Sequence, residues 1–309
     1  MSSRPARARR STWWAVAVTS PAALEEGLVA AFWEAGCLGV EARSAARRGR
    51  RRGPGPMRLE AWFAGTHRGG ALRDRLRRRL AAAGLEPGAL ARVDLRRVPD
   101  GRWVEAWQKT LKPMPIGRRL LALPEDCPAP SSGGRIAIRI PFGQAFGTGE
   151  HASTRLVLRF METLVRPGDR VLDLGTGTGI LAVAALRLGA GEVTAVDSDP
   201  VAVAVARETL RRNGIVHGIA LRRSDAGAAL DGGRFDRILV NIGATVIGRI
   251  LPGLERALAP GGTAILAGIL IDDEGPLTEA AGRAGLAVVA RRRLRPWSAL
   301  VITKAARRS

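Results

Sequence analysis

The sequence predicts an α/β protein, in which a doubly wound, mostly parallel sheet follows a small α+β domain. From residue 135 onward, strand-like and helix-like stretches alternate, as they do in βαβ units. Before residue 99 the order is strand, helix, strand, strand, helix, strand, which is typical of a ferredoxin-like sandwich. The chain has 309 residues, of which 46% are hydrophobic, so it can bury two cores. We therefore expect domains at 1–98 and 135–309, joined by a connector at 99–134.

The elements of the first domain follow from the spacing of its apolar residues. Strands are expected at 12–19, 38–43, 58–63 and 91–98, and helices at 21–35 and around the stripe of Leu72, Leu76 and Leu80. This domain carries no acid–base or metal-ligand constellation. We therefore expect it to recognise or dock a partner.

The connector is interrupted by prolines at positions 113, 115, 124, 128 and 130. A short helix is expected at 103–111, where Trp103 and Trp107 lie four residues apart and share a face. We favour packing against a neighbouring domain over substrate contact for these two side chains.

The most informative stretch of the second domain is a strand followed by a turn with three alternating glycines. The apolar strand at 171–174 leads into Gly175, Gly177 and Gly179, and the next strand ends on Asp197. Glycines let a ligand approach the backbone, and a carboxylate at that place can accept both hydroxyls of a ribose. Dinucleotide enzymes space their glycines as G-x-G-x-x-G, whereas here they run G-x-G-x-G behind an Asp. The pattern resembles the first motif of class I S-adenosylmethionine-dependent methyltransferases, whose cofactor has no pyrophosphate.

A second glycine-rich loop, residues 141–154, lies between an expected strand at 135–140 and a helix at 156–164. It contains Phe146, Gly147 and Thr148, and we expect it to form a lid on the nucleoside site. The remaining strands are expected at 191–196, 220–223, 235–241, 263–267, 286–294 and 299–303, and the remaining helices at 180–188, 200–213, 245–258 and 272–284. A seven-stranded sheet with a terminal antiparallel pair is the methyltransferase variation on the doubly wound sheet.

Methyl transfer from a sulfonium is an in-line displacement, so the protein mainly has to align donor and acceptor. Asn241 ends an apolar strand at the edge where the methyl group would lie, and its amide oxygen can accept an N–H bond from an incoming amine. Capping of the next helix is the alternative role for Asn241. His151 or Glu150 could relay a proton, although desolvation of a lysine acceptor makes a strong base optional.

Several stretches closely resemble the PrmA family, methyltransferases of the bacterial ribosomal large-subunit protein L-eleven. The likeness rests on Ala145–Thr154, Asp173–Gly179, Val240–Ala244, Leu258–Gly262, Gly268–Leu270, and Trp103, Trp107 and Lys112–Met114 in the connector. It implies an N-terminal substrate-recognition domain, a flexible connector, and trimethylation of lysine side chains and of the N-terminal amine. By resemblance, cofactor contacts fall on Thr154, Gly175, Asp197 and Asn241. Gly243 replaces a family leucine and makes the rim beside the acceptor less bulky.

The formal net charge is +21, and only Lys109, Lys112 and Lys304 among the 49 basic residues are lysines. Coding bias explains this composition as well as attraction to nucleic acid does. We hypothesise that the basic stretch Arg47–Arg52 touches ribosomal RNA near the substrate protein, which would be met free or on the large subunit.

Other compositional features limit the remaining classes. Cys37 and Cys127 are too far apart for a metal-ligand pair, and His67, His151 and His217 are scattered, so no metal site is expected. No apolar run is long enough to span a membrane and no signal peptide is evident, so we expect a cytoplasmic protein, monomeric by default. The alternatives are a methyltransferase of another basic protein, of RNA or of a small molecule, and a non-catalytic ribosome-assembly factor that binds the cofactor.

Overall fold

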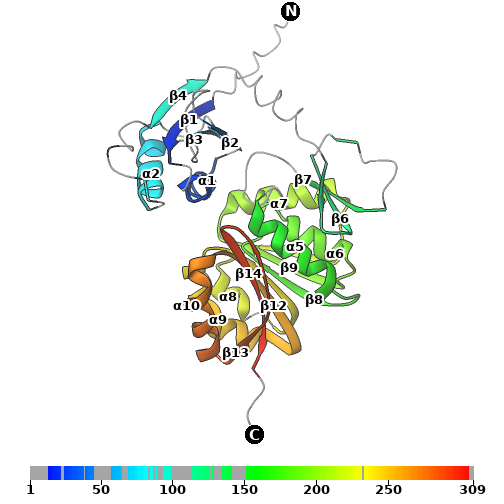
Figure 1. The fold of residues 1–309 in the computed structure, drawn as a ribbon. Helices are drawn as coiled ribbons and strands as arrows, with labels where there is room; N and C mark the ends of the chain where they lie inside the picture. The colour runs from blue at the N-terminus through cyan, green and yellow to red at the C-terminus, as the bar shows by residue number, and fades with distance from the viewer. Residues whose placement is uncertain are drawn as a thin grey trace, which may run out of the picture. The chain divides into compact units, whose positions relative to one another are not determined.

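The computed structural model of the chain describes residues 13–21, 24–37, 39–44, 57–64, 69–82, 84–85, 88, 93–98, 113–124, 127–128, 134–140, 151–231 and 233–305. The chain divides into two units, residues 1–111 and 112–309, and each is described by itself (Figure 1). No helix within the described residues is both long and apolar enough to cross a membrane.

The first unit has the predicted ferredoxin-like order. Its elements are β1 (Trp13–Ser20), α1 (Glu25–Glu34), β2 (Gly39–Ser44), β3 (Met57–Ala64), α2 (Gly69–Ala82) and β4 (Asp94–Val98). The four strands form one antiparallel sheet in the order β2-β3-β1-β4. The predicted stripe of Leu72, Leu76 and Leu80 is fully buried and packs α2 into the core that α1 and the sheet share.

The second unit contains the predicted seven-stranded sheet, in the order β10-β9-β8-β11-β12-β14-β13. Its strands are β8 (Arg170–Leu174), β9 (Glu192–Asp197), β10 (Ile219–Arg223), β11 (Phe235–Asn241), β12 (Leu258–Leu270), β13 (Leu286–Leu294) and β14 (Trp297–Lys304). The first five strands of the sheet order pair in parallel, and β14 pairs antiparallel with both β12 and β13. This confirms the doubly wound class I methyltransferase fold.

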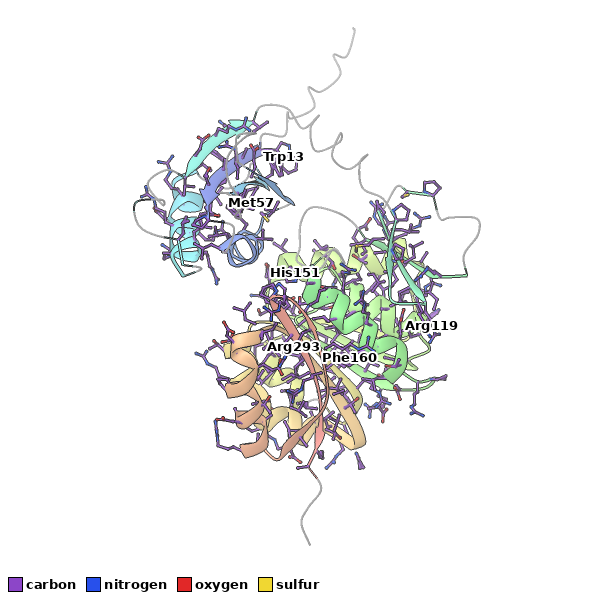
Figure 2. The ribbon with its side chains drawn as sticks, in the orientation of Figure 1. Trp13, Met57, Arg119, His151, Phe160 and Arg293 are labelled. Atoms are coloured by element: carbon purple, nitrogen blue, oxygen red, sulfur yellow. The ribbon has the colours of Figure 1, made fainter. Side chains whose placement is uncertain are left out.

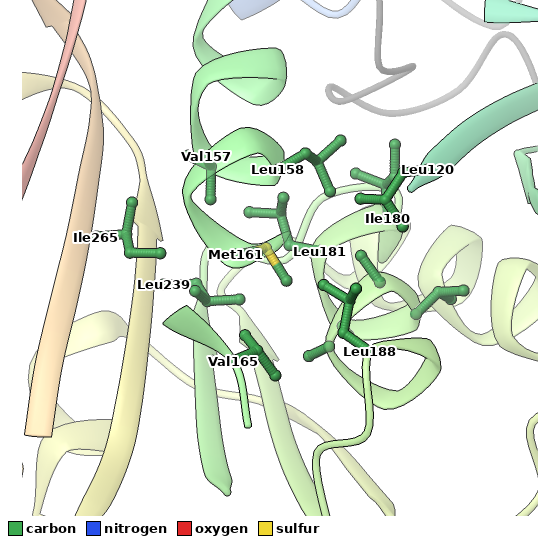
Figure 3. Packing of buried hydrophobic residues seen from close by; sticks show 14 of the residues in the cluster. Leu120, Val157, Leu158, Met161, Val165, Ile180, Leu181, Leu188, Leu239 and Ile265 are labelled. Atoms are coloured by element: carbon green, nitrogen blue, oxygen red, sulfur yellow. The ribbon is translucent and has the colours of Figure 1, made fainter. Parts of the chain in front are cut away.

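Helices cover both faces of this sheet. Successive residues of each strand point to opposite sides, so each face carries apolar side chains for the helices to bury. The helices are α5 (Ala152–Leu164), α6 (Ile180–Arg187), α7 (Pro200–Arg212), α8 (Ala226–Leu230), α9 (Ala244–Ala257) and α10 (Glu274–Arg283), the last preceded by the short helix η2 (Ile271–Asp273). In β11, Leu239 packs toward α5 and α6, and Val240 packs toward α9. Figure 3 shows the core between the sheet, α5 and α6, in which Met161 of α5 lies between Leu239 of β11 and Leu181 of α6.

The structure divides the chain differently from the predicted connector at 99–134. Residues 114–116 and 120–124 form β5 (Met114–Ile116) and β6 (Leu120–Pro124), which join β7 (Ile136–Ile140) in a separate three-stranded sheet. This small sheet contributes Ile116, Leu120 and Ile138 to the core around α5, so it belongs to the second unit. The prolines suggested a linker. Pro115 lies in the edge strand β5, where a missing N–H is tolerated, and Pro124 is the last residue of the central strand β6. The expected helix at 103–111, with its two tryptophans, lies outside the described residues.

Glu162 anchors the small sheet to α5. Its carboxylate accepts hydrogen bonds from the backbone amides of Arg118, Arg119 and Leu120, at 2.9, 2.7 and 3.1 Å. Gly117 opens this turn with a φ of 57°, and a Cβ there would lie 2.1 Å from a Glu162 carboxylate oxygen. The turn and the carboxylate therefore fit together only with glycine at this position.

Replacing Glu162 by alanine is expected to lower the free energy of unfolding by about 1–3 kcal/mol, because three amides lose a charged acceptor. Glu192→Ala is the matched control, since Glu192 is 59% exposed and pairs only across the surface with Arg170. That control should change stability by no more than about 0.5 kcal/mol. Urea denaturation of both variants measures the difference, and equal effects would show that Glu162 does not hold the small sheet.

Candidate functional site

The glycine-rich turn lies at the carboxyl end of β8, between β8 and α6. Gly175, Gly177 and Gly179 have φ values of 72°, 54° and 82°, a region that other residues rarely adopt. A Cβ on Gly175 would come within 2.6 Å of the Ile242 side chain. The backbone amides of Gly175 and Thr176 both donate to the Val196 carbonyl, which ties the turn to β9.

Asp197 ends β9 beside this turn. One of its carboxylate oxygens accepts a hydrogen bond from the Gly177 amide at 3.0 Å, and the other accepts one from the Asp199 amide, also at 3.0 Å. The structure therefore brings together Gly175, Gly177 and Asp197, three of the predicted cofactor residues. They form a bare-backbone corner next to a half-buried carboxylate, which suits a ribose diol.

Asn241 and Thr154 meet at the same edge of the sheet, although they are far apart in the chain. The Asn241 amide nitrogen donates to the Thr154 hydroxyl at 3.1 Å, and both side chains are buried. Within the described residues, the Asn241 amide oxygen Oδ1 is buried and has no hydrogen-bond partner. Because an unmet buried acceptor is costly, it points to a donor supplied by a ligand.

His151, which the sequence offered as a proton relay, caps helix α5. Its Nδ1 accepts a hydrogen bond from the Ser153 amide at 3.3 Å and lies 2.7 Å from the Ser153 hydroxyl. Burial lowers the pKa of His151 to about 4, so the ring is neutral near pH 7. Figure 2 shows His151 at the start of α5, close to the tip of the β13–β14 hairpin.

Trp297 and Asp225 belong to this edge of the sheet and were not predicted. The Trp297 ring lies edge-on to His151, with centroids 4.7 Å apart. Trp297 pairs with Leu270 at the end of β12, so only strand register, which the sequence does not display, places it here. Ser224 donates its amide to the Asp197 carbonyl, and the next residue, Asp225, caps α8 by accepting a hydrogen bond from the Ala228 amide. An Asp directly after the strand at 220–223 was the available signal for Asp225.

Some predicted residues cannot be placed. Phe146, Gly147 and Thr148 of the expected lid, Glu150, and the basic stretch Arg47–Arg52 lie outside the described residues. Among the residues that are described, no group of three or more His, Cys, Asp or Glu side chains could hold a metal ion.

The comparisons with known proteins agree with this geometry. A family model described as ribosomal protein L11 methyltransferase (PrmA) matches residues 12–305. A ribosomal protein L11 methyltransferase of Symbiobacterium thermophilum is 43% identical over 217 residues, which cover 70% of each chain. One from Synechococcus is 34% identical over 307 residues, which cover 97% of this chain and 100% of the relative.

A solved structure gives the same result for the fold. The ribosomal protein L11 methylase of Lactobacillus delbrueckii subsp. bulgaricus is 30% identical and superposes with a TM-score of 0.58, covering 63% of this chain and 100% of its own. The family match spans nearly the whole sequence, and it includes the turn, the Asn241–Thr154 pair and both units. The chain belongs to the PrmA family of ribosomal protein L11 methyltransferases.

Proposed function

We propose that this chain transfers methyl groups from S-adenosylmethionine to amines of ribosomal protein L11, on lysine side chains and at the N-terminus. The observation that carries the proposal is the buried Asn241 Oδ1, which has no partner among the described residues and lies at the edge of the sheet that also holds Asp197. An amine presents N–H groups to such an acceptor while keeping its lone pair directed at the methyl group.

The residues present fit the cofactor. Asp197 can accept the two ribose hydroxyls, and the open backbone of Gly175 and Gly177 leaves room for the nucleoside. The Asn241 amide nitrogen donates to the Thr154 hydroxyl, which leaves the Asn241 oxygen for the incoming amine. When bound, the cofactor supplies an electrophilic methyl group on a positively charged sulfur. Phe146, Gly147 and Thr148 are proposed to close over it.

The acceptor amine must be neutral to react. A lysine with a pKa near 10.4 pays about 4.6 kcal/mol to lose its proton at pH 7, and both desolvation and the nearby sulfonium lower that pKa. His151, with a pKa lowered to about 4, is a weak base for this task. In this proposal His151 therefore acts as a positioning residue that sets the start of α5, while Asn241 contacts the substrate.

The wider setting is also a proposal. Residues 1–98 would recognise the substrate protein, free or on the large ribosomal subunit, and the basic stretch Arg47–Arg52 would touch ribosomal RNA there. The chain would act in the cytoplasm as a monomer. The net charge of +21 favours one alternative function, methylation of the RNA itself.

One experiment separates these functions: large subunits that lack the modification are incubated with the enzyme and labelled S-adenosylmethionine. We expect the label in protein L11 and none above background in RNA. Label in RNA would support RNA methylation, and cofactor binding without any transfer would indicate an assembly factor.

Asp197→Ala is expected to weaken cofactor binding about ten- to a hundredfold, because two ribose hydroxyls lose a charged acceptor. Asp231→Ala is the control, since Asp231 is exposed and follows α8 near the start of β11, at the opposite edge of the sheet. Calorimetric titration with the cofactor measures both. Affinity equal to that of the control would remove Asp197 from the site.

A further inference from the structure

Asp173 is a buried carboxyl group directly before the glycine-rich turn, and the mechanism so far gives it no role. It is fully buried at the end of β8. Its Oδ2 accepts a hydrogen bond from the Thr176 hydroxyl at 2.7 Å, and its Oδ1, within the described residues, is buried without a partner. A carboxylate in this setting is poorly solvated, so its ionisation costs more free energy than in water.

The groups around Asp173 do not offset that cost. The neighbouring strand β9 contributes Asp197, whose negative charge opposes a second one, and β11 contributes the apolar Leu239 at the paired position. Among the described residues, helix α6 contributes the Ala182 backbone amide, and the turn contributes the Thr176 hydroxyl. Burial first and Asp197 second raise the pKa of Asp173 to about 7, against the Thr176 hydrogen bond and the Ala182 amide.

Asp173 is next to last in β8 and Asp197 is last in the adjacent parallel strand β9, so both lie beside the glycine-rich turn. S-adenosylmethionine carries a sulfonium, an ammonium and a carboxylate group, so its arrival adds a net positive charge beside Asp173 and Asp197. A cation close to a carboxyl group favours the ionised form, and the unpartnered Oδ1 is available to interact with it.

We propose that Asp173 is a neutral carboxylic acid in the free protein and releases its proton to solvent when the positively charged cofactor binds. The O–H bond of Asp173 breaks, the proton goes to buffer, and the carboxylate left behind balances the incoming charge. The inference rests on the proposed function only in taking S-adenosylmethionine as the ligand. It makes cofactor affinity depend on pH through a residue that does not take part in methyl transfer.

The size of the effect follows from the fraction of Asp173 that is already ionised. With a pKa of about 7, about one tenth is ionised at pH 6 and about nine tenths at pH 8. If binding requires the ionised form, the dissociation constant of the wild type should fall about tenfold between these two pH values.

Calorimetric titration of the full chain with S-adenosylmethionine, repeated in buffers of different ionisation enthalpy, tests this. At pH 6 the wild type should release close to one proton per cofactor bound, and at pH 8.5 almost none. Asp173→Asn, which mimics the protonated acid in shape, should release none at either pH. Because it cannot ionise, its affinity should be at least about tenfold weaker than that of the wild type at pH 6 and at least about a hundredfold weaker at pH 8. Asp231→Asn, at the opposite edge of the sheet, should behave as the wild type does.

Thermal melting without cofactor gives a second readout. Because the pKa of Asp173 is higher in the folded protein than in the unfolded chain, the ionisation of Asp173 increasingly disfavours the folded state as pH rises from about 4 to 7. Asp173→Asn cannot ionise and lacks this effect. The difference in melting temperature between Asp173→Asn and the wild type should therefore be at least about 3 °C larger at pH 8.5 than at pH 5.

The outcomes separate this inference from the proposed function. Cofactor binding without proton release at pH 6, or equal release by Asp173→Asn, overturns the inference and leaves the function standing. Failure of a folded wild type to bind S-adenosylmethionine at any pH overturns the function and the inference together. The analogue S-adenosylhomocysteine, which lacks the sulfonium charge, identifies the group that Asp173 senses: equal proton release indicates the ammonium, and reduced release indicates the sulfonium.

Discussion

Asn241→Ala is expected to lower kcat for L11 methylation by about a hundredfold, while cofactor affinity falls by less than about tenfold. The reason is geometric: within the described residues the Asn241 oxygen is a buried acceptor without a partner, and alanine leaves the amine unoriented. Steady-state kinetics with purified L11 gives kcat, and calorimetry gives the cofactor affinity.

The Thr154 hydroxyl provides matched controls for this prediction. Thr154→Ser keeps the oxygen that accepts from Asn241 and should keep kcat within about threefold. Thr154→Val removes that oxygen, lets the amide turn, and should cost about tenfold. In the double variant, Thr154→Val should add little to Asn241→Ala, because both act through one interaction. Wild-type kcat in Asn241→Ala would exclude Asn241 from substrate contact.

Gly268→Ala is expected to destabilise the second unit by about 3–5 kcal/mol. Gly268 lies in β12 with a φ of 80°, and a Cβ there would lie 2.4 Å from the backbone oxygen of Ile242. The left-handed conformation costs a residue with a side chain about 1–2 kcal/mol, and the forced shift of Ile242 adds a similar amount or more. Because Ile242 follows Asn241, that shift should also reduce activity in the protein that remains folded.

Gly261→Ala is the control that measures the backbone strain without the clash. Gly261 has nearly the same φ, 73°, but no atom lies within 4 Å of the position its Cβ would take. It should therefore cost only about 1–2 kcal/mol. Urea denaturation of both variants gives the comparison. Equal losses would mean that Gly268 is required for its backbone conformation and not for the approach of Ile242.

Local patterns predicted the elements well, because period and turn residues report on neighbours in the chain. The alternation in residues 12–98 and the Leu72 stripe were enough for the ferredoxin-like order, and three glycines with Asp197 were enough for the turn after β8 and the carboxylate beside it. The small sheet was missed because Pro115 and Pro124 signal a linker locally, while burial against α5 makes residues 114–124 strands.

The contacts that define the site could not be predicted in the same way, because they depend on register and on long-range pairing. The hydrogen bond from Asn241 to Thr154 joins the end of β11 to the start of α5. The packing of Trp297 on His151 depends on how β14 pairs with β12. Asp173 reads as an ordinary motif residue in the sequence. Only its complete burial beside Asp197 shows that its charge is unstable.

The most direct test of the whole account is the intact mass of unmodified ribosomal protein L11 after incubation with this enzyme and S-adenosylmethionine, followed by peptide mapping. We expect the mass to rise in whole methyl increments, located on lysine side chains and the N-terminal amine, and to stay unchanged when the cofactor is omitted. An L11 mass that does not change with folded enzyme and saturating cofactor would contradict the account.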